Sequence, residues 1–247
     1  MMKVKGLIER KRESLQYFVS QLMSSEVKRY IGKIFLFGSV ASGKIREDSD
    51  VDILILCFDK TNLVLERCID VRMETYFRYS ESVEPLIYPI EVMRNPTSYF
   101  LYRISRYGEE VYGMQENELK RQEAKNYLIL ASEYLEGATE SLKSKRIRIA
   151  IDTGYNAAEL TAKALLLLEL DEIPSSHGGV VGEFGKLYIK TERIEREIGR
   201  RLNKALDLRN KARYVYNAEI SALQAEEVIK LAEKMIQIAP DYMERSM

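Results

Sequence analysis

The chain has 247 residues, enough for two domains of about 100–150 residues each. Hydrophobic residues make up 46% and charged residues 31%, a composition that argues against a disordered chain. The sequence has no long apolar run, so a membrane protein is not expected and the cytoplasm is the expected location. The 38 basic residues balance 38 acidic ones, and two cysteines and one histidine are too few for a disulfide framework, a four-ligand zinc site or a Ser-His-Asp triad.

The first part of the chain mixes strand and helix signals. Strands are predicted over three apolar runs and a weaker fourth segment, at 34–37, 51–58, 83–90 and 110–112. Helical periodicity lies between them, at 2–23, at 62–79 and in a short segment after Asn95-Pro96. Pro85 and Pro89 place the third strand at a sheet edge or a bulge, because proline cannot donate to a strand ladder. We therefore expect an α+β domain, a short mixed sheet with helices, over residues 1–114.

Beyond residue 117 the strand signal disappears. Helices are predicted at 117–143, 147–170, 179–190, 192–214 and 219–238, with Gly, Pro, Ser and Asn at the breaks between them. This pattern is typical of an all-α helical bundle, which we expect over residues 115–247. The boundary between the two domains is expected within 113–118.

The most informative stretch runs from Gly38 to Asp52. A buried strand is predicted to end at Gly38, where the missing side chain lets the backbone approach a bulky ligand. Ser39 then offers a hydroxyl and an N–H at an expected helix start, which suits phosphate oxygens. After ten intervening residues come Asp50 and Asp52, whose alternation along a strand points both carboxylates to one face. Such a pair suits Mg²⁺ together with substrate phosphates, although each half of the pattern alone is common in structural turns.

Together, the Gly-Ser pair, the ten intervening residues and the Asp-x-Asp pair resemble the signature of the minimal nucleotidyltransferases, a branch of the DNA polymerase beta-like superfamily. The resemblance implies transfer of a nucleoside monophosphate, usually AMP from ATP, onto a hydroxyl, with release of pyrophosphate. It also implies that Gly38 and Ser39 hold the triphosphate and that Asp50 and Asp52 bind Mg²⁺.

Two features of that family are less clear in this sequence. Many relatives carry arginines just after the Gly-Ser turn, and here Lys44 and Arg46 are the candidates to bind the nucleotide in their place. The family also has a third carboxylate on a later strand, which influences the choice of the base toward the attacking hydroxyl. We expect Glu84 in this role and as a third Mg²⁺ ligand beside Asp50 and Asp52, because it precedes an apolar run as Asp52 does, with Glu91 as the alternative.

The second half resembles the HEPN (higher eukaryotes and prokaryotes nucleotide-binding) fold, through Ser-His-Gly-Gly at 176–179 and the stretch 208–216. Many HEPN ribonucleases carry Arg, four to six residues, then His, and a toxin subgroup adds Tyr two residues after the His. Arg209, Tyr214 and Tyr216 fit that frame with Tyr in place of His. Tyrosine, with a pKa near 10, is a poor proton acceptor at neutral pH, so we expect no metal-independent RNA cleavage from the bundle.

The remaining polar residues of that half have ordinary structural interpretations. His177 lies outside the Arg–Tyr frame, and we expect it to make a hydrogen bond at a loop or helix start. Arg209 is expected to pair with an acid of a neighbouring helix such as Glu159, which can itself pair with Lys163 four residues later.

These resemblances predict a transferase that moves AMP from Mg-ATP, or another nucleoside triphosphate, onto a hydroxyl of a protein, an RNA or a small molecule. They also predict that it acts in a system like a toxin–antitoxin pair. The alternatives are a HEPN ribonuclease regulated by the transferase half and a catalytically quiet nucleotide-binding module. Tyr216 is a hypothetical acceptor by self-modification, in cis or across a homodimer formed through the helical domain. No membrane partner is expected.

Overall fold

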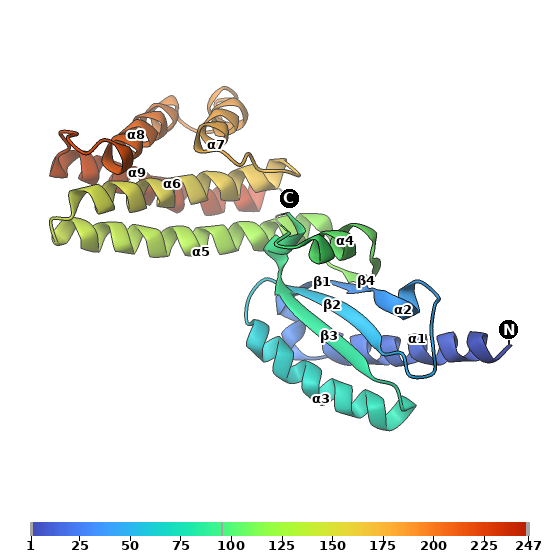
Figure 1. Ribbon diagram of the computed structural model, residues 1–247. Coiled ribbons are helices and arrows are strands. Elements are labelled where there is room, and N and C mark those ends of the chain that lie inside the picture. The colour runs from blue at the N-terminus through green and yellow to red at the C-terminus, as the bar shows by residue number, and fades with distance from the viewer. Residues whose placement is uncertain (1, 95, 246–247) are drawn as a thin grey trace. The chain divides into compact units, whose positions relative to one another are not determined.

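The computed structural model describes residues 2–94 and 96–245 of the chain. The chain divides into two compact units, one up to Glu116 and one from Asn117 onward (Figure 1). Each unit has its own apolar core, so each is described separately.

The first unit is built on a four-stranded mixed sheet. Its strands are β1 Ile31–Leu36, β2 Val51–Cys57, β3 Val83–Pro89 and β4 Glu109–Gly113, in the spatial order β3-β2-β1-β4. β2 and β3 run parallel, whereas β1 is antiparallel to both β2 and β4. β3 is an edge strand, as Pro85 and Pro89 predict. The expected α+β architecture with a short mixed sheet is therefore confirmed.

Helices accompany this sheet. Their bounds are α1 Met2–Met23, α2 Gly38–Ala41, α3 Thr61–Tyr79 and α4 Tyr99–Tyr107, with 3-10 turns at Glu26–Tyr30 and Ile90–Met93. α1 and α3 pack against each other and share a core with the sheet through side chains such as Phe18 and Val71. In Figure 1, α4 lies on the opposite side of the strands from α3. β2 is buried along nearly its whole length, which explains its almost unbroken apolar sequence.

Both cysteines of the chain lie in this first unit, and both are free buried thiols. Burial raises the pKa of Cys57 to about 12. Burial, with a smaller contribution from Cys57, raises the pKa of Cys68 to about 12 as well. Neither thiol is therefore a candidate nucleophile or metal ligand.

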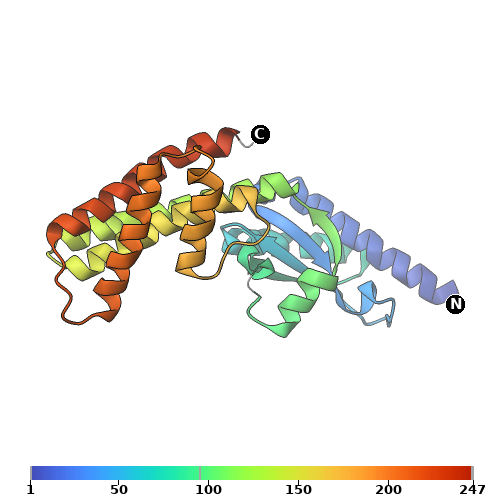
Figure 2. The same ribbon diagram turned by 90° about the horizontal axis from the view of Figure 1, so that it is seen from above.

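The second unit is helical throughout its regular elements. These are α5 Glu116–Lys143, α6 Ile147–Glu169, α7 His177–Phe184, a π-helical turn Gly185–Ile189, α8 Arg196–Tyr214 and α9 Ala222–Arg245 (Figure 2). α6 is the central helix and packs against α7, α8 and α9. Its residues Ala150, Tyr155 and Leu165 are fully buried, as a core helix requires. The expected all-α bundle is confirmed.

Several helix boundaries differ from the prediction by a few residues, and two of the larger differences have a physical cause. α8 begins at Arg196 and not at 192, because Glu192 has a positive φ of 60°, which is incompatible with a continuing right-handed helix. α9 continues beyond 238 through Pro240. Ala239 and Met243 are buried on either side of that proline, so packing of the apolar face maintains the helix where proline removes a backbone donor.

Among the described residues, no helix combines the length and the apolar character that a membrane span requires.

Candidate functional site

The turn after β1 lies directly against the Asp52 carboxylate. Gly38 has a positive φ of 74°, and a Cβ built on it would lie 2.2 Å from Oδ2 of Asp52. The backbone N–H of Phe37 donates to the carbonyl of Asp52 at 3.0 Å, which fixes the end of β1 against the start of β2. A glycine is thus required at this position both by backbone conformation and by the closeness of the carboxylate. Ser39 follows in the short helix α2 and is half-buried.

Three acidic residues are grouped beside this turn. Asp50 is exposed and immediately precedes β2, whereas Asp52 is half-buried on the strand. Glu84 stands opposite Asp52 in the parallel pairing of β2 with β3. Glu91 lies in the 3-10 turn that follows the other end of β3, and it is exposed. The structure therefore brings Glu84, and not Glu91, into register with Asp52.

The electrostatics of the group indicate a shortage of positive charge. Burial raises the pKa of Asp52, and the negative charges of Asp50 and Glu84 raise it further. Glu84 is partly compensated, because its Oε1 accepts hydrogen bonds from Arg72 Nη2 and from Ser82 Oγ, the latter at 2.9 Å. A cation bound near Asp50 and Asp52 would relieve the remaining repulsion.

The donor set determines which cation fits. Within residues 2–94 and 96–245, no three His, Cys, Asp or Glu side chains are grouped closely enough to hold a metal ion by themselves. Mg²⁺ does not need such a cage, because it binds through one or two carboxylates together with substrate phosphates and waters. Asp50 and Asp52 beside the Gly38 turn fit that mode, whereas two carboxylates alone are too few ligands for a structural metal centre.

The two basic candidates lie on the loop between α2 and β2. Lys44 and Arg46 are both exposed. The loop itself is ordered by two bonds between Arg46 and Ser49, from backbone N–H to Oγ at 2.9 Å and from backbone N–H to carbonyl at 3.2 Å. In the described part of the chain, neither basic side chain forms an ion pair, so both remain available to anionic groups.

A buried ion pair behind this site was not anticipated from the sequence. Lys11 of α1 is 1% exposed and Glu81 is 3% exposed, and the two form a salt bridge. Lys11 Nζ also donates to the carbonyl of Ser49 at 2.5 Å. A signal was present in the sequence, because Lys11 precedes Leu15 and Phe18 by four and seven residues and so occupies the apolar phase of α1.

The helical unit contains a separate polar cluster that joins three helices. His177 Nδ1 lies 2.6 Å from Glu159 Oε1, and its Nε2 lies 3.1 Å from Arg209 Nη2. Because arginine can only donate, Nε2 must accept, which fits an imidazole with its proton on Nδ1 donated to Glu159. The expected hydrogen bond of His177 at a helix start is confirmed, and so is the Glu159–Lys163 pair at 3.5 Å.

The acid paired with Arg209 differs from the one suggested by the sequence. Arg209 Nε lies 3.2 Å from Asp152 Oδ1. Both atoms are buried and neither makes a hydrogen bond of good geometry. Asp152 lies on α6 about two helical turns before Glu159. Glu159 is occupied by His177 and by Tyr155, whose hydroxyl lies 3.3 Å away. Burial, reinforced by the Glu159 charge, raises the pKa of Tyr155, so its hydroxyl stays neutral.

The two motif tyrosines are both exposed. Tyr214 ends α8 with 70% of its surface exposed, and its ring lies 5.7 Å from the guanidinium of Arg209. Tyr216 follows on the turn after α8 and is 92% exposed. Arg148 holds this turn, because its Nη2 donates to the carbonyl of Tyr216 at 2.8 Å and its Nη1 to that of Val215 at 2.9 Å.

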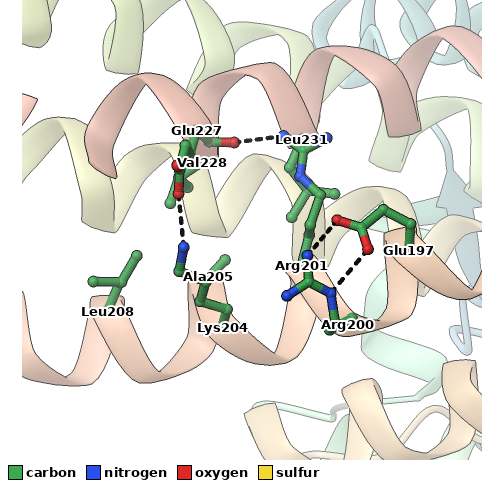
Figure 3. Close-up of a pocket in the computed structure, with 9 residues that line it drawn as sticks. All are labelled: Glu197, Arg200, Arg201, Lys204, Ala205, Leu208, Glu227, Val228 and Leu231. Atoms are coloured by element: carbon green, nitrogen blue, oxygen red, sulfur yellow. Dashed lines mark hydrogen bonds and ion pairs between the residues drawn. The ribbon is translucent and has the colours of Figure 1, made fainter. Parts of the chain in front are cut away.

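A groove between α8 and α9 is lined by charged side chains, most of which pair with one another (Figure 3). It is lined by Glu197, Arg200, Arg201, Lys204, Ala205, Leu208, Glu227, Val228 and Leu231. Arg200 binds Glu197 at 2.7 Å, and Lys204 binds Glu227 at 2.9 Å. Arg201 donates to the Glu227 carbonyl at 2.9 Å. Both carboxylates are therefore paired, while Arg201 leaves the groove with one positive charge in excess, and the groove contains none of the predicted site residues.

Comparisons with known proteins match both units. The family described as "Polymerase beta, Nucleotidyltransferase" matches residues 21–117, and the "HEPN domain" family matches residues 124–242. A protein of Methanocaldococcus jannaschii named "Putative toxin" is 33% identical over 116 residues, which are 47% of this chain and 85% of that protein. Another from the same organism, named "Putative protein adenylyltransferase", is 34% identical over 89 residues, which are 36% of this chain and 87% of that protein.

Proposed function

The chain belongs to the polymerase beta-type nucleotidyltransferases in its first part and to the HEPN family in its second, and from this membership we propose that the first unit transfers AMP from Mg-ATP onto a hydroxyl. The observation that carries the proposal is the closeness of the Gly38 turn to the Asp52 carboxylate, with Glu84 in register beside it. The Gly38 turn, to which we assign phosphate binding, and the carboxylates thus lie together at one end of the sheet. The relative named as a protein adenylyltransferase favours AMP as the transferred group.

Each side chain has a distinct part in this proposal. Gly38 and Ser39 bind the phosphates, because the turn offers backbone N–H groups and a hydroxyl without a blocking Cβ. Lys44 and Arg46 add positive charge from the exposed loop. Asp50 and Asp52 hold Mg²⁺, which supplies positive charge to the phosphates during transfer.

Glu84 is proposed to accept the proton of the attacking hydroxyl. Both of its recorded hydrogen bonds, from Arg72 and Ser82, use Oε1. Oε2 therefore remains to take a proton, while Arg72 holds the carboxylate in place. Transfer forms the bond between the acceptor oxygen and the α-phosphorus and breaks the bond to pyrophosphate.

The test measures pyrophosphate release from each of four labelled nucleoside triphosphates with Mg²⁺, together with the intact mass of the protein and of added RNA. Asp52→Asn should abolish release, because one cation ligand is lost without loss of core volume. Glu84→Gln should reduce it strongly, whereas Glu91→Gln, the same charge change beyond the other end of β3, should not. Undiminished transfer by Asp52→Asn would refute the assignment.

For the acceptor, the proposal is Tyr216 of the same chain or of a homodimer partner, in a system like a toxin–antitoxin pair. The side chain is almost fully exposed, which a phenol acceptor requires, and Arg148 orders the backbone of its turn. The relative named as a toxin supports this setting. An RNA end or a small molecule remains the alternative acceptor, and the mass measurements distinguish these.

A specific observation favours a second candidate function, RNA cleavage by the helical unit. The sequence lacks the motif histidine, yet the structure brings Nε2 of His177 to 3.1 Å from Arg209 Nη2, with Glu159 orienting the ring. When Arg209 binds the RNA phosphate in place of the imidazole, Nε2 is free to take the proton of a ribose 2′-hydroxyl, the 2′-oxygen attacks the phosphorus, and the 5′-oxygen leaves with a proton from water. Cleavage in EDTA that disappears in His177→Asn would establish this activity, and intact RNA would exclude it.

A further inference from the structure

We propose that Lys11 is a positioning residue that sets the Mg²⁺ affinity of the transferase site by fixing the peptide that leads into Asp50; this inference rests on the proposed function. Lys11 is 1% exposed on the apolar face of α1, where a lysine is costly unless its ammonium is paired. Its Nζ has two recorded partners, the Glu81 carboxylate and the Ser49 carbonyl. Ser49 lies just before β2, which carries Asp52, and Glu81 lies just before β3, which carries Glu84.

The contact with Ser49 determines the orientation of Asp50. The carbonyl of Ser49 and the N–H of Asp50 belong to one planar peptide unit, so a bond to the carbonyl fixes the whole plane. On the other side of Asp50, the N–H of Val51 donates to the carbonyl of Ser82 at 2.9 Å. Asp50 thus lies between two anchored peptides, although its own side chain is exposed.

The contact with Glu81 explains why the anchor is rigid. Glu81 is buried and accepts a second charged hydrogen bond from Arg10 Nε at 2.6 Å. The ammonium of Lys11 therefore binds a carboxylate whose position is fixed by Arg10. If the ammonium moved toward solvent, the buried Glu81 charge would lose this partner, at a large cost in free energy. Residues that orient a metal ligand in this way typically change metal affinity when they are replaced.

Two variants separate positioning from stability. Lys11→Met removes both the ion pair and the Ser49 anchor, whereas Glu81→Gln removes only the negative charge and keeps a side-chain oxygen that accepts from Lys11, so the ammonium stays directed at Ser49. Both should lower the melting temperature of the full chain. Lys11→Met alone should raise the Mg²⁺ concentration for half-maximal ATP binding by about tenfold, and it alone should accelerate amide exchange over residues 47–52.

The double variant Lys11→Met/Glu81→Met covers the case in which Lys11→Met does not fold. Replacing both partners of a buried pair by apolar groups usually recovers stability, so this variant should regain melting temperature while its Mg²⁺ midpoint stays raised. Calorimetry gives the midpoint without any need for turnover.

Three results would overturn the inference: a wild-type Mg²⁺ midpoint in Lys11→Met, an equal rise in Glu81→Gln, or full recovery of the midpoint in the double variant. Wild-type protein that binds ATP without dependence on Mg²⁺, or does not bind it, would refute the proposed function and the metal role of Lys11 with it. Amide exchange over 47–52 then still decides whether Lys11 anchors this segment.

Discussion

Gly38→Ala tests the packing of the Gly38 turn against Asp52, and Gly43→Ala is its matched control. Both glycines have nearly the same positive φ, 74° and 70°, so alanine at either position costs about 1–2 kcal/mol of backbone energy. They differ in space, because nothing lies within 4 Å of a Cβ at Gly43, whereas at Gly38 the Asp52 Oδ2 would be 2.2 Å away.

The extra cost at Gly38 follows from how the clash can be relieved. Asp52 has a short side chain on a buried strand, so its carboxylate can move only by leaving its preferred rotamer, at about 0.5–1.5 kcal/mol. Gly38→Ala should therefore destabilise the first unit by that much more than Gly43→Ala does. It should also weaken Mg²⁺-dependent ATP binding, because the displaced carboxylate is a proposed ligand.

The assay is denaturant unfolding followed by amide exchange in peptides from β1 and β2, which isolates the first unit of the full chain. An Asp52→Ala background completes a double-mutant cycle. In that background the carboxylate is gone, and Gly38→Ala should cost only as much as Gly43→Ala. Equal costs for the two alanine variants in the wild-type background, with unchanged ATP binding, would refute the reasoning.

Three further predictions concern single side chains. The pKa of Asp52 is raised in the folded protein, so the protonated carboxyl stabilises the metal-free fold at low pH, and this stabilisation is lost as the pH rises from about 4. The amide of Asp52→Asn does not ionise and should keep the stabilisation. Near neutral pH the variant should therefore unfold at no lower denaturant concentration than wild type. Tyr216→Phe should remove any AMP adduct found by intact mass after incubation with Mg-ATP, and persistence of the adduct excludes this acceptor. His177→Ala leaves the buried Glu159 carboxylate without its 2.6 Å partner and should cost the helical unit about 1–3 kcal/mol; a loss below about 0.5 kcal/mol contradicts the importance of that contact.

The elements of this protein were largely predictable because their signals are local. The apolar run of β2 indicated a strand buried on both faces, and the two prolines of β3 indicated an edge. The Gly38–Asp52 spacing defined the candidate site. Each of these inferences needs only a short window of sequence.

The contacts that were missed depend on packing between distant segments. Lys11 reaches Ser49 and Glu81 across separations of 38 and 70 residues, and nothing local distinguishes a buried lysine from a solvated one except its phase on the helix. His177 and Arg209 are 32 residues apart, and only the packing of α7 and α8 on α6 brings them together. The sequence favours Glu159 as the partner of Arg209, but α6 presents Asp152, about two turns earlier, to that arginine.

The two buried cysteines make the opening of the first unit chemically visible. Burial raises the pKa of both thiols to about 12, so almost no thiolate is present at pH 8, and burial also keeps an alkylating reagent away from the sulfur atoms. Modification must therefore wait until the segment around β2 and α3 opens, and the helical unit, which has no cysteine, adds no background. The mass gained with time from the alkylating reagent records how long the first unit stays closed inside the intact chain, and both reporting cysteines are native.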